Sequence, residues 1–273
     1  MEICQGEKFI INNNIFSKKD FKEEKVVGNT NIYEVIRIIE GVPLFLEDHI
    51  KRMMRSLEIM DMDHRIPKEY LEKSIKELIK ANESKEGNVK IVFNGDKNTL
   101  AGYYIPHHYP EQSQYIEGVD TILYFAEREN PNAKVINNNL RNNVNAALNK
   151  CGAYEAILID KHNKVTEGSR SNIFMVKGDT LITSTMDKVL PGITRQFILK
   201  VAKTTGTNIE ERNLSVDELR SVDGLFISGT SPKVLPIKKV DDSIFHSANN
   251  EVVKKIYDGY NKLVSKYIEE RKK

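Results

Sequence analysis

Alternating and helically spaced apolar positions predict short strands and helices throughout the first half of the chain. Residues 32–39, which lead into a turn at 40–43, and residues 89–93 have the Val, Ile, Tyr and Phe content typical of strands. Two helices, each with one buried face, are predicted by apolar residues about one turn apart: Ile50, Met53, Met54 and Leu57 in the first, and Leu71, Ile75, Leu78 and Ile79 in the second.

The second half of the chain alternates strands with helices. Strands are predicted at residues 121–126, 153–159, 173–176 and 224–227. Residues 191–194 begin a helix, Gly206 suits its carboxyl end, and Ser215 to Glu218 form a capping box. Three helical stripes are predicted from their apolar members: Leu140, Val144 and Leu148; Phe197, Ile198, Val201 and Ala202; and a last run from Val253 to Tyr267.

These elements indicate an α/β class, or mixed α+β, built as two mixed domains. Residues 94–118 include Pro106 and Pro110 and are expected to be irregular, which places a domain boundary near their end. We therefore predict an N-terminal domain at residues 1–115 and a C-terminal domain at residues 116–273. A chain of 273 residues is long enough to bury a sizeable core.

Composition and charge narrow the class of protein. The 41 basic and 39 acidic residues leave a net charge of +2, so charge gives no reason to expect nucleic acid or an anionic membrane as a partner. No apolar run approaches the ~18–20 residues of a membrane span. The first residues lack a basic segment followed by an apolar one, so we expect no secretory signal and a reducing cytoplasm.

The two cysteines point away from disulfide and metal chemistry. Cys4 and Cys151 cannot form a disulfide framework, and they lack the spacing of metal ligands. Cys151 follows an apolar helical pattern, so we expect it to be a small buried residue. His107 and His108 adjoin prolines and no carboxylate cluster, so no metal site is predicted.

Glu167 stands out because it lies in a turn rich in Gly, Ser and Asn between two apolar runs. One interpretation is a surface hairpin with a solvated carboxylate. In the other, the carboxylate is held between buried strands and needs a partner, because burying an unpaired charge is costly. A protonated ring nitrogen of a cofactor would be such a partner.

Two other turns are suited to an anion. Gly192 to Thr194 lie at a helix start, where backbone N–H groups and the positive dipole end favour phosphate, although such a glycine is commonly just a cap. Ser228 to Ser231 follow an apolar strand and offer hydroxyl groups. Arg52, on the first helix, would complete a phosphate site or would simply be an exposed arginine.

A catalytic lysine or serine has no clear local signal. Lys134 lies in a short link between a strand and a helix, where functional groups are commonly displayed. Ser169 lacks the last glycine of a nucleophile elbow and has no assigned base, which argues against a serine hydrolase.

Taken in order, these segments resemble the class IV family of pyridoxal-phosphate enzymes, which includes D-amino-acid aminotransferase, branched-chain aminotransferase and aminodeoxychorismate lyase. The resemblance implies fold type IV, two mixed domains with the cofactor between them, and usually a homodimer. It covers most of the chain and rests on residues 33–37, 47–52, 134–137, 154–158, 166–174, 190–195 and 228–230.

The same resemblance implies a role for individual residues. Lys134 would attach pyridoxal 5′-phosphate through its amine and move a proton as general base and acid. Glu167 would pair with the pyridine nitrogen, and Tyr33 would face the substrate side of the ring. The remaining cofactor-binding residues would be Arg52, Ser171, Asn172, Ile193, Thr194 and Thr230, with Arg52, Thr230 and the backbone of Ile193 and Thr194 on the phosphate.

The substrate side departs from the family pattern. The Arg-x-His carboxylate trap of the D-amino-acid enzymes would place an Arg where this chain has Ile105, although His107 remains. The substrate carboxylate would then meet Arg37, which shares a strand face with Tyr33 by period-two alternation. The alternative is an Arg37 paired structurally with a carboxylate.

The leading hypothesis is a cytoplasmic, homodimeric aminotransferase of amino acid metabolism. It would move an amino group between a small α-amino acid, of branched-chain or D-amino acid type, and a 2-oxo acid. An alternative is an aminodeoxychorismate lyase-type β-elimination that releases pyruvate. A third possibility is a binding protein without activity on the same scaffold.

Overall fold

The computed structural model describes residues 4–62 and 67–272, and these form two compact units. Residues 1–3, part of the stretch in which no secretory signal is expected, lie outside the described residues. The described residues divide as follows: unit 1 takes those up to His108, Ala133–Ile136 and those from Val264 onward, and unit 2 takes Tyr109–Asn132 and Asn137–Leu263. The predicted domain ranges, 1–115 and 116–273, stay a prediction.

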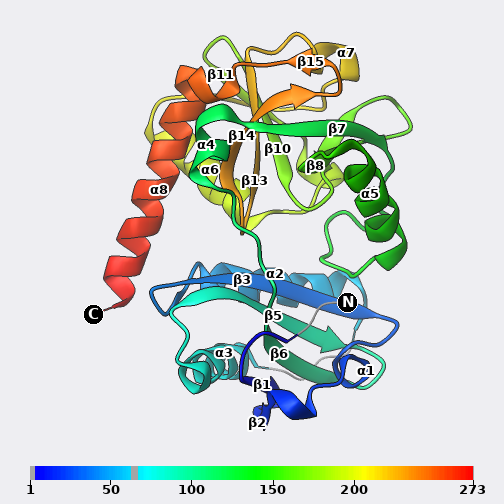
Figure 1. Cartoon of the computed structure of the whole chain (residues 1–273), viewed down its shortest axis with the longest axis vertical. Helices are drawn as coiled ribbons and strands as arrows, with labels where there is room; N and C mark the ends of the chain where they lie inside the picture. The colour runs from blue at the N-terminus through cyan, green and yellow to red at the C-terminus, as the bar shows by residue number, and fades with distance from the viewer. Residues whose placement is uncertain (1–3, 63–66, 273) are drawn as a thin grey trace. The chain divides into compact units, whose positions relative to one another are not determined.

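Unit 1 is built on an antiparallel sheet with the strand order β2-β1-β6-β5-β3-β4 (Figure 1). Its strands are β1 (Lys8–Ile11), β2 (Asn14–Ser17), β3 (Asn31–Ile39), β4 (Val42–Pro43), β5 (Glu86–Asn94) and β6 (Thr99–Ile105). Its helical segments before residue 108 are η1 (Lys18–Asp20), α1 (Glu23–Val26), α2 (Leu46–Ile59) and α3 (Lys68–Asn82). The two strands and two helices predicted in this half are all present.

Successive residues of β3 serve opposite faces of the sheet, as strand geometry requires. On one face Ile32, Ile36 and Ile38 pack in a core with apolar residues of α2 and α3. On the other face Tyr33 packs in a second cluster with Phe9, Tyr103 and other buried residues. Glu34 falls on the first face, among the isoleucines, so a carboxylate is carried into the apolar core.

The stretch expected to be irregular, residues 94–118, is more ordered than its prolines suggested. It contains β6, which pairs with β5 along its length, and a short helix, α4 (Gln112–Glu117). β6 escaped detection because buried residues line both of its faces, so that its apolar positions do not alternate.

Unit 2 is built on a mixed sheet with the strand order β12-β11-β10-β13-β14-β7-β8-β9, and β15 pairs with β14. Its strands are β7 (Val119–Phe125), β8 (Glu155–Ile159), β9 (Val165–Gly168), β10 (Asn172–Lys177), β11 (Thr180–Thr183), β12 (Asn208–Glu211), β13 (Gly224–Gly229), β14 (Lys233–Val240) and β15 (Ser243–Ile244). The pairs β11–β12, β14–β7 and β7–β8 are parallel, whereas the other neighbours are antiparallel.

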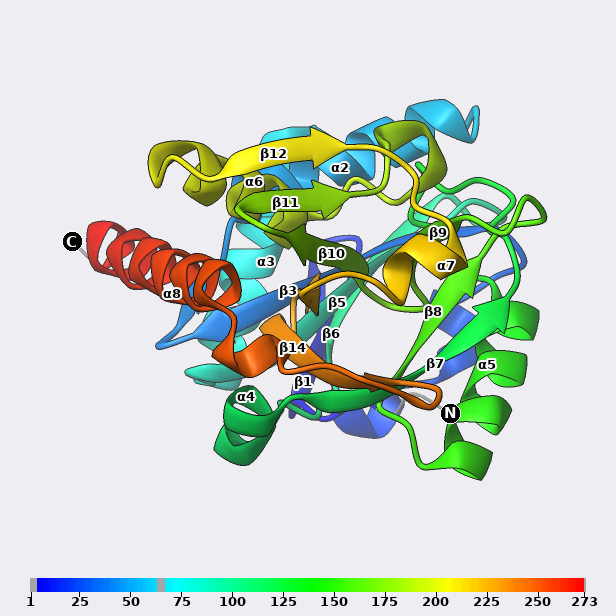
Figure 2. The ribbon, with the colours of Figure 1, turned by 90° about the horizontal axis from the view of Figure 1, so that it is seen from above.

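Helices border this sheet as the apolar stripes predict. Figure 2 shows α5 (Asn138–Cys151) beside β7 and β8, where its Val144 and Leu148 pack with Ala156. The remaining helical segments are η2 (Met186–Lys188), α6 (Ile193–Thr204), α7 (Val216–Leu219), η3 (Ser247–Asn249) and α8 (Glu251–Arg271). The capping box of Ser215 and Glu218 is formed, and Gly206 has a positive φ of 67° just after α6.

The expectation that Cys151 is buried is wrong. Cys151 is an exposed free thiol at the last position of α5, whereas Cys4 is buried. The apolar stripe of α5 buries Val144 and Leu148, and the chain then turns away through Gly152, whose φ is 66°. Because Cys151 comes after the last buried residue of the α5 stripe, its side chain lies in solvent.

Two further searches concern the described residues alone. Within residues 4–62 and 67–272, no helix combines the length and the apolar composition needed to cross a membrane. Over the same two ranges, no group of three or more His, Cys, Asp and Glu side chains is arranged to hold a metal ion.

A buried ion pair ties α2 to β3 inside unit 1. Glu34, 1% exposed, accepts hydrogen bonds from Arg52 Nε at 2.7 Å and Arg52 Nη2 at 2.6 Å. His49 Nδ1 lies 2.7 Å from the same carboxylate. Burial alone would raise the pKa of Glu34, but the Arg52 charge and these hydrogen bonds outweigh it and lower the pKa to about 2.

The ion pair predicts an acid dependence of stability. Because the folded-state pKa of Glu34 lies below its ordinary value of 4.5, the stabilisation is fully present above that value and is lost as pH falls toward 2. The shift corresponds to about 3 kcal/mol. Urea unfolding should therefore show that Glu34→Gln is less stable than wild type at neutral pH and loses less stability from about pH 5 to pH 3.

Glu72→Gln is the matched control, since Glu72 forms an exposed pair with Lys76 at 2.6 Å. It should change the free energy of unfolding by less than about 0.5 kcal/mol. An identical pH dependence in Glu34→Gln and wild type would contradict the account.

Candidate cofactor site

The segment that carries Lys134 lies along β3 in unit 1. Its neighbour Val135 forms a bridge with Ile32, and the Tyr33 N–H donates to the Lys134 carbonyl at 3.1 Å. The Lys134 N–H in turn donates to Ser56 Oγ of α2 at 3.2 Å. Backbone contacts on both sides therefore fix the start of the Lys134 side chain.

Two lysine side chains reach the same aromatic ring. Lys134 Nζ lies 4.7 Å from the centroid of the Tyr33 ring, and Lys90 Nζ, from the neighbouring strand β5, lies 5.3 Å from it. Burial lowers the pKa of His49, and the charges of Arg52 and Lys134 lower it further against the opposing effect of Glu34. Lys134 thus lies in a positively charged, aromatic part of unit 1.

The interpretation of Arg52 as an exposed arginine is wrong. Arg52 is buried, and two of its nitrogens donate to Glu34. A buried guanidinium held in this way has a fixed orientation, as recognition of an anion requires. Its contact with a phosphate stays a prediction.

The two substrate-side residues occupy different parts of unit 1. Arg37 is half-buried on β3, opposite Asn88 of β5, and falls on the same face as Tyr33. His107 is exposed just beyond β6, with Nδ1 3.4 Å from the Ile105 carbonyl oxygen. Their roles in substrate binding stay predictions.

The solvated-hairpin interpretation of Glu167 is wrong. Glu167 is 2% exposed and lies within β9, not in the turn that follows it. Its Oε1 accepts from Arg128 Nη1 at 3.2 Å, and its Oε2 accepts from the Leu190 N–H at 3.0 Å. The second interpretation, a buried carboxylate with a partner, describes this geometry.

The turn after Glu167 is organised by another buried carboxylate, that of Glu155 on β8. Glu155 accepts from Ser169 Oγ at 2.6 Å, from Ser171 Oγ at 3.0 Å and from the Arg170 N–H at 3.3 Å. Ser169 is therefore a donor in a structural turn, as expected of a serine without a base. Ser171, whose role as a cofactor ligand stays a prediction, is part of the same turn.

Three segments of unit 2 meet at the beginning of α6. Asn172 pairs with Ser228 across β10 and β13, and its amide donates to the Leu190 carbonyl at 2.9 Å. Gly192 lies so close that an added Cβ would come within 2.0 Å of Asn172 Oδ1. The turns predicted for an anion, at residues 192–194 and 228–231, are therefore brought to one place through Asn172.

This place has the properties of an anion site. Ile193 and Thr194, 4% and 5% exposed, open α6, and no side chain caps the helix. A buried helix start without a cap needs an acceptor for its backbone N–H groups, and the helix dipole favours a negative one. Ser228 Oγ is buried without a hydrogen-bond partner. Thr230 lies in the turn that joins β13 to β14.

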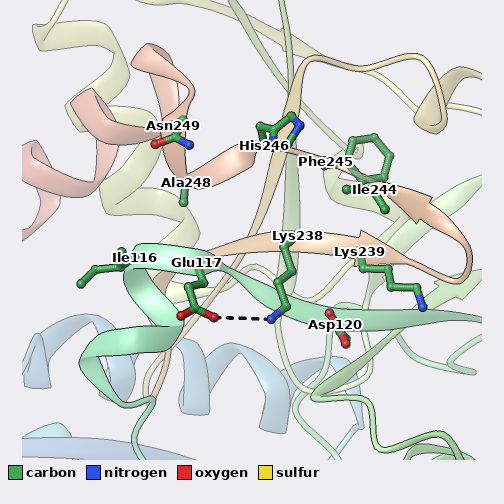
Figure 3. Close-up of a pocket in the computed structure, with 10 residues that line it drawn as sticks. All are labelled: Ile116, Glu117, Asp120, Lys238, Lys239, Ile244, Phe245, His246, Ala248 and Asn249. Atoms are coloured by element: carbon green, nitrogen blue, oxygen red, sulfur yellow. Dashed lines mark ion pairs between the residues drawn. The ribbon is translucent and has the colours of Figure 1, made fainter.

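A hollow of about 560 Å³ in unit 2 contains none of the predicted site residues. It is lined by residues of α4, β7, β14, β15 and η3, and Figure 3 shows Lys238 directed toward Glu117, with 3.7 Å between nitrogen and oxygen. This hollow is therefore separate from Lys134 and Glu167.

The sequence did not indicate three groups that the structure singles out: Arg128, the Leu190 N–H and the buried hydroxyl of Ser228. Arg128 lies in the loop after β7 and has no sequence pattern to mark it. The Leu190 N–H is a backbone group, so residue type gives no signal. The turn that contains Ser228 was noticed, but burial, which the sequence does not reveal, is what singles out its hydroxyl.

Known proteins match this chain over most of its length. The family model "Amino-transferase class IV" matches residues 31–240. A D-alanine aminotransferase of Bacillus licheniformis is 28% identical over 236 residues, which cover 81% of this chain and 83% of the relative. An aminodeoxychorismate lyase of Bacillus subtilis (strain 168) is 24% identical over 257 residues, covering 88% and 87%.

A solved structure shares the fold. A branched-chain amino acid aminotransferase from T.th., with pyridoxamine 5′-phosphate, superimposes with a TM-score of 0.84 at 21% identity and covers 97% of this chain and 96% of its own. The fold expected from the resemblance, a mixed α/β chain of fold type IV, is confirmed, and the structure shows two sheets. Because the family model spans well over half of its residues, the chain belongs to the class IV aminotransferase family.

Proposed function

We propose that this chain is a pyridoxal-phosphate-dependent aminotransferase that exchanges the amino group of a small α-amino acid for the keto oxygen of a 2-oxo acid. The observation that carries the proposal is the burial of Glu167, 2% exposed, with its two oxygens aligned by Arg128 and the Leu190 N–H. A carboxylate fixed in this way suits the protonated ring nitrogen of the cofactor, which supplies an electron sink when bound.

The residues present fit the cofactor's phosphate. The uncapped start of α6 offers backbone N–H groups, and the orphan Ser228 hydroxyl offers a further donor. We propose that these groups, with Thr230 and the Arg52 guanidinium, bind the phosphate. Asn172 holds the start of α6 in place through Leu190.

We propose that Lys134 would hold the cofactor through its Nζ, and that the same Nζ, as a neutral amine, would take the proton from the substrate α-carbon. A nearby positive charge favours the neutral amine that both tasks need, and Lys90 supplies one above the same Tyr33 ring. Tyr33 would face the substrate side of the cofactor ring. We also propose that the protein is a homodimer in the cytoplasm; both cysteines are free thiols, as a reducing compartment maintains them.

The amino-acid carboxylate is proposed to meet Arg37, which shares a strand face with Tyr33. The nature of the side chain, branched or small, and the L or D configuration are left to experiment. One relative is named as a D-alanine aminotransferase. Another is named as an aminodeoxychorismate lyase, so the lyase reaction is a second candidate.

An amino-donor screen tests the proposed reaction. Purified protein loaded with pyridoxal phosphate is mixed with single L or D amino acids, and the absorbance of the bound cofactor is followed. At least one donor should convert the cofactor to its amine form, and a 2-oxo acid should restore it, with ping-pong kinetics. Repeated pyruvate release, without an amino acceptor and without conversion of the cofactor to its amine form, would favour the lyase, and no conversion by any donor would reject the aminotransferase.

Replacing Lys134 and Lys90 one at a time tests which of the two lysines is the catalytic amine. Lys134→Ala should lower kcat by at least about 10²–10⁴-fold, because the base that moves the α-proton is lost. Lys90→Met should retain amino transfer at a reduced rate, because Lys90 contributes charge and not the amine. Rate measurements that show a larger loss in Lys90→Met than in Lys134→Ala would reverse the assignment.

Arg37→Ala tests the substrate carboxylate contact. Loss of a charge-assisted hydrogen bond should raise KM for the amino acid by about 10–100-fold with little change in kcat. Arg55→Ala, which removes an exposed arginine of α2, is the control and should leave both constants unchanged. An unchanged KM in Arg37→Ala would exclude this contact.

A further inference from the structure

The ion pair between Arg128 and Glu167 differs from the buried pair between Arg52 and Glu34. Arg128 makes one contact with Glu167, at 3.2 Å, and its side chain is 19% exposed. Arg52, in contrast, holds Glu34 through two nitrogens at 2.7 Å and 2.6 Å and is almost fully buried. The Arg128 contact is thus longer, single and open to solvent, as expected of a pair that a ligand can share.

A cation is not required to bury a glutamate in this part of the fold. Glu155, on the strand next to β9, is 4% exposed, and its carboxylate is satisfied by Ser169 Oγ, Ser171 Oγ and backbone N–H groups. Hydroxyl and amide donors leave the full negative charge on the oxygens. An arginine instead offsets that charge, and so weakens the attraction of the carboxylate for a second cation.

We propose that Arg128 is a positioning residue that competes with the ring nitrogen of pyridoxal phosphate for Glu167 and thereby limits how firmly this nitrogen holds its proton. The inference rests on the proposed function, because it needs the ring nitrogen to meet Glu167. Arg128 directs the Glu167 carboxylate before the cofactor arrives, and afterwards shares the carboxylate with it. The Leu190 N–H keeps the second oxygen in place in both states.

The test compares pyridoxal phosphate with its 1-deaza analogue, in which a C–H replaces the ring nitrogen. Both compounds carry the same phosphate, aldehyde and ring hydroxyl, so contacts with those groups cancel in the ratio of the dissociation constants, analogue over cofactor. This ratio reports the interaction of Glu167 with the ring nitrogen. It is measured by titrating cofactor-stripped, full-length protein with each compound.

Removal of the Arg128 charge should increase the ratio. In Arg128→Met we expect a rise of about three- to tenfold over wild type, as for the loss of a partly buried competing charge. Arg128→Lys retains a cation and should stay near wild type. Arg220→Met removes an arginine that pairs at 3.9 Å with Asp217 on α7, and should leave the ratio unchanged.

A second signal comes from the cofactor itself. With ¹⁵N in the ring, the nitrogen resonance of the bound cofactor should move toward the protonated form in Arg128→Met. A purely structural role for Arg128 would lower thermal stability without moving this resonance or the ratio.

The outcomes separate the two claims. A ratio above one in wild type that falls toward one in Glu167→Gln supports the placement of Glu167 at the ring nitrogen. If Glu167 is placed at the ring nitrogen by this result but Arg128→Met leaves the ratio unchanged or lowers it, the proposal that Arg128 competes for Glu167 is wrong. If wild type binds the two compounds equally, the placement of Glu167 at the nitrogen fails, and the inference fails with it.

Discussion

The need to compensate buried carboxylates governs both units of this chain. Glu34 and Glu167 are each almost inaccessible to water, and an unpaired charge in such a place would strongly destabilise the fold. In unit 1 the partner is Arg52, and the pair joins a helix to the central strands. In unit 2 the partner is Arg128, and the pair lies where a cofactor is proposed to bind.

The pair of Glu34 with Arg52 stabilises the fold, whereas the pair of Glu167 with Arg128 lies in the proposed cofactor site. The bidentate pair of Glu34 holds α2 against β3, and so orients Arg52 and places Ser56 to meet the backbone of Lys134. Glu167 meets Arg128 through one nitrogen, at 3.2 Å, instead of two. At the start of α6, the backbone N–H groups and the Ser228 hydroxyl are buried polar groups that a bound anion would satisfy.

Much of the fold follows from sequence periodicity, since amphipathic helices and alternating strands leave a clear pattern. β6 left no such pattern, because buried residues line both of its faces. The exposure of Cys151 could not be predicted either, because the apolar stripe of α5 continues to Cys151 but the buried part of the helix ends before it. Glu167 and Lys134 were noticed in the sequence, but burial decided between the two interpretations of Glu167. Arg128 and the Leu190 N–H depend on contacts between distant segments, which no local pattern encodes.

The central claim is that Lys134 carries the cofactor in this chain, and chemical trapping tests it most directly. Borohydride reduction of the protein loaded with pyridoxal phosphate fixes the cofactor to the lysine that holds it, and peptide mass spectrometry then identifies that residue. The account predicts a single reduced adduct on the peptide that contains Lys134. An adduct on Lys90 or another lysine, or no adduct at all, would contradict it.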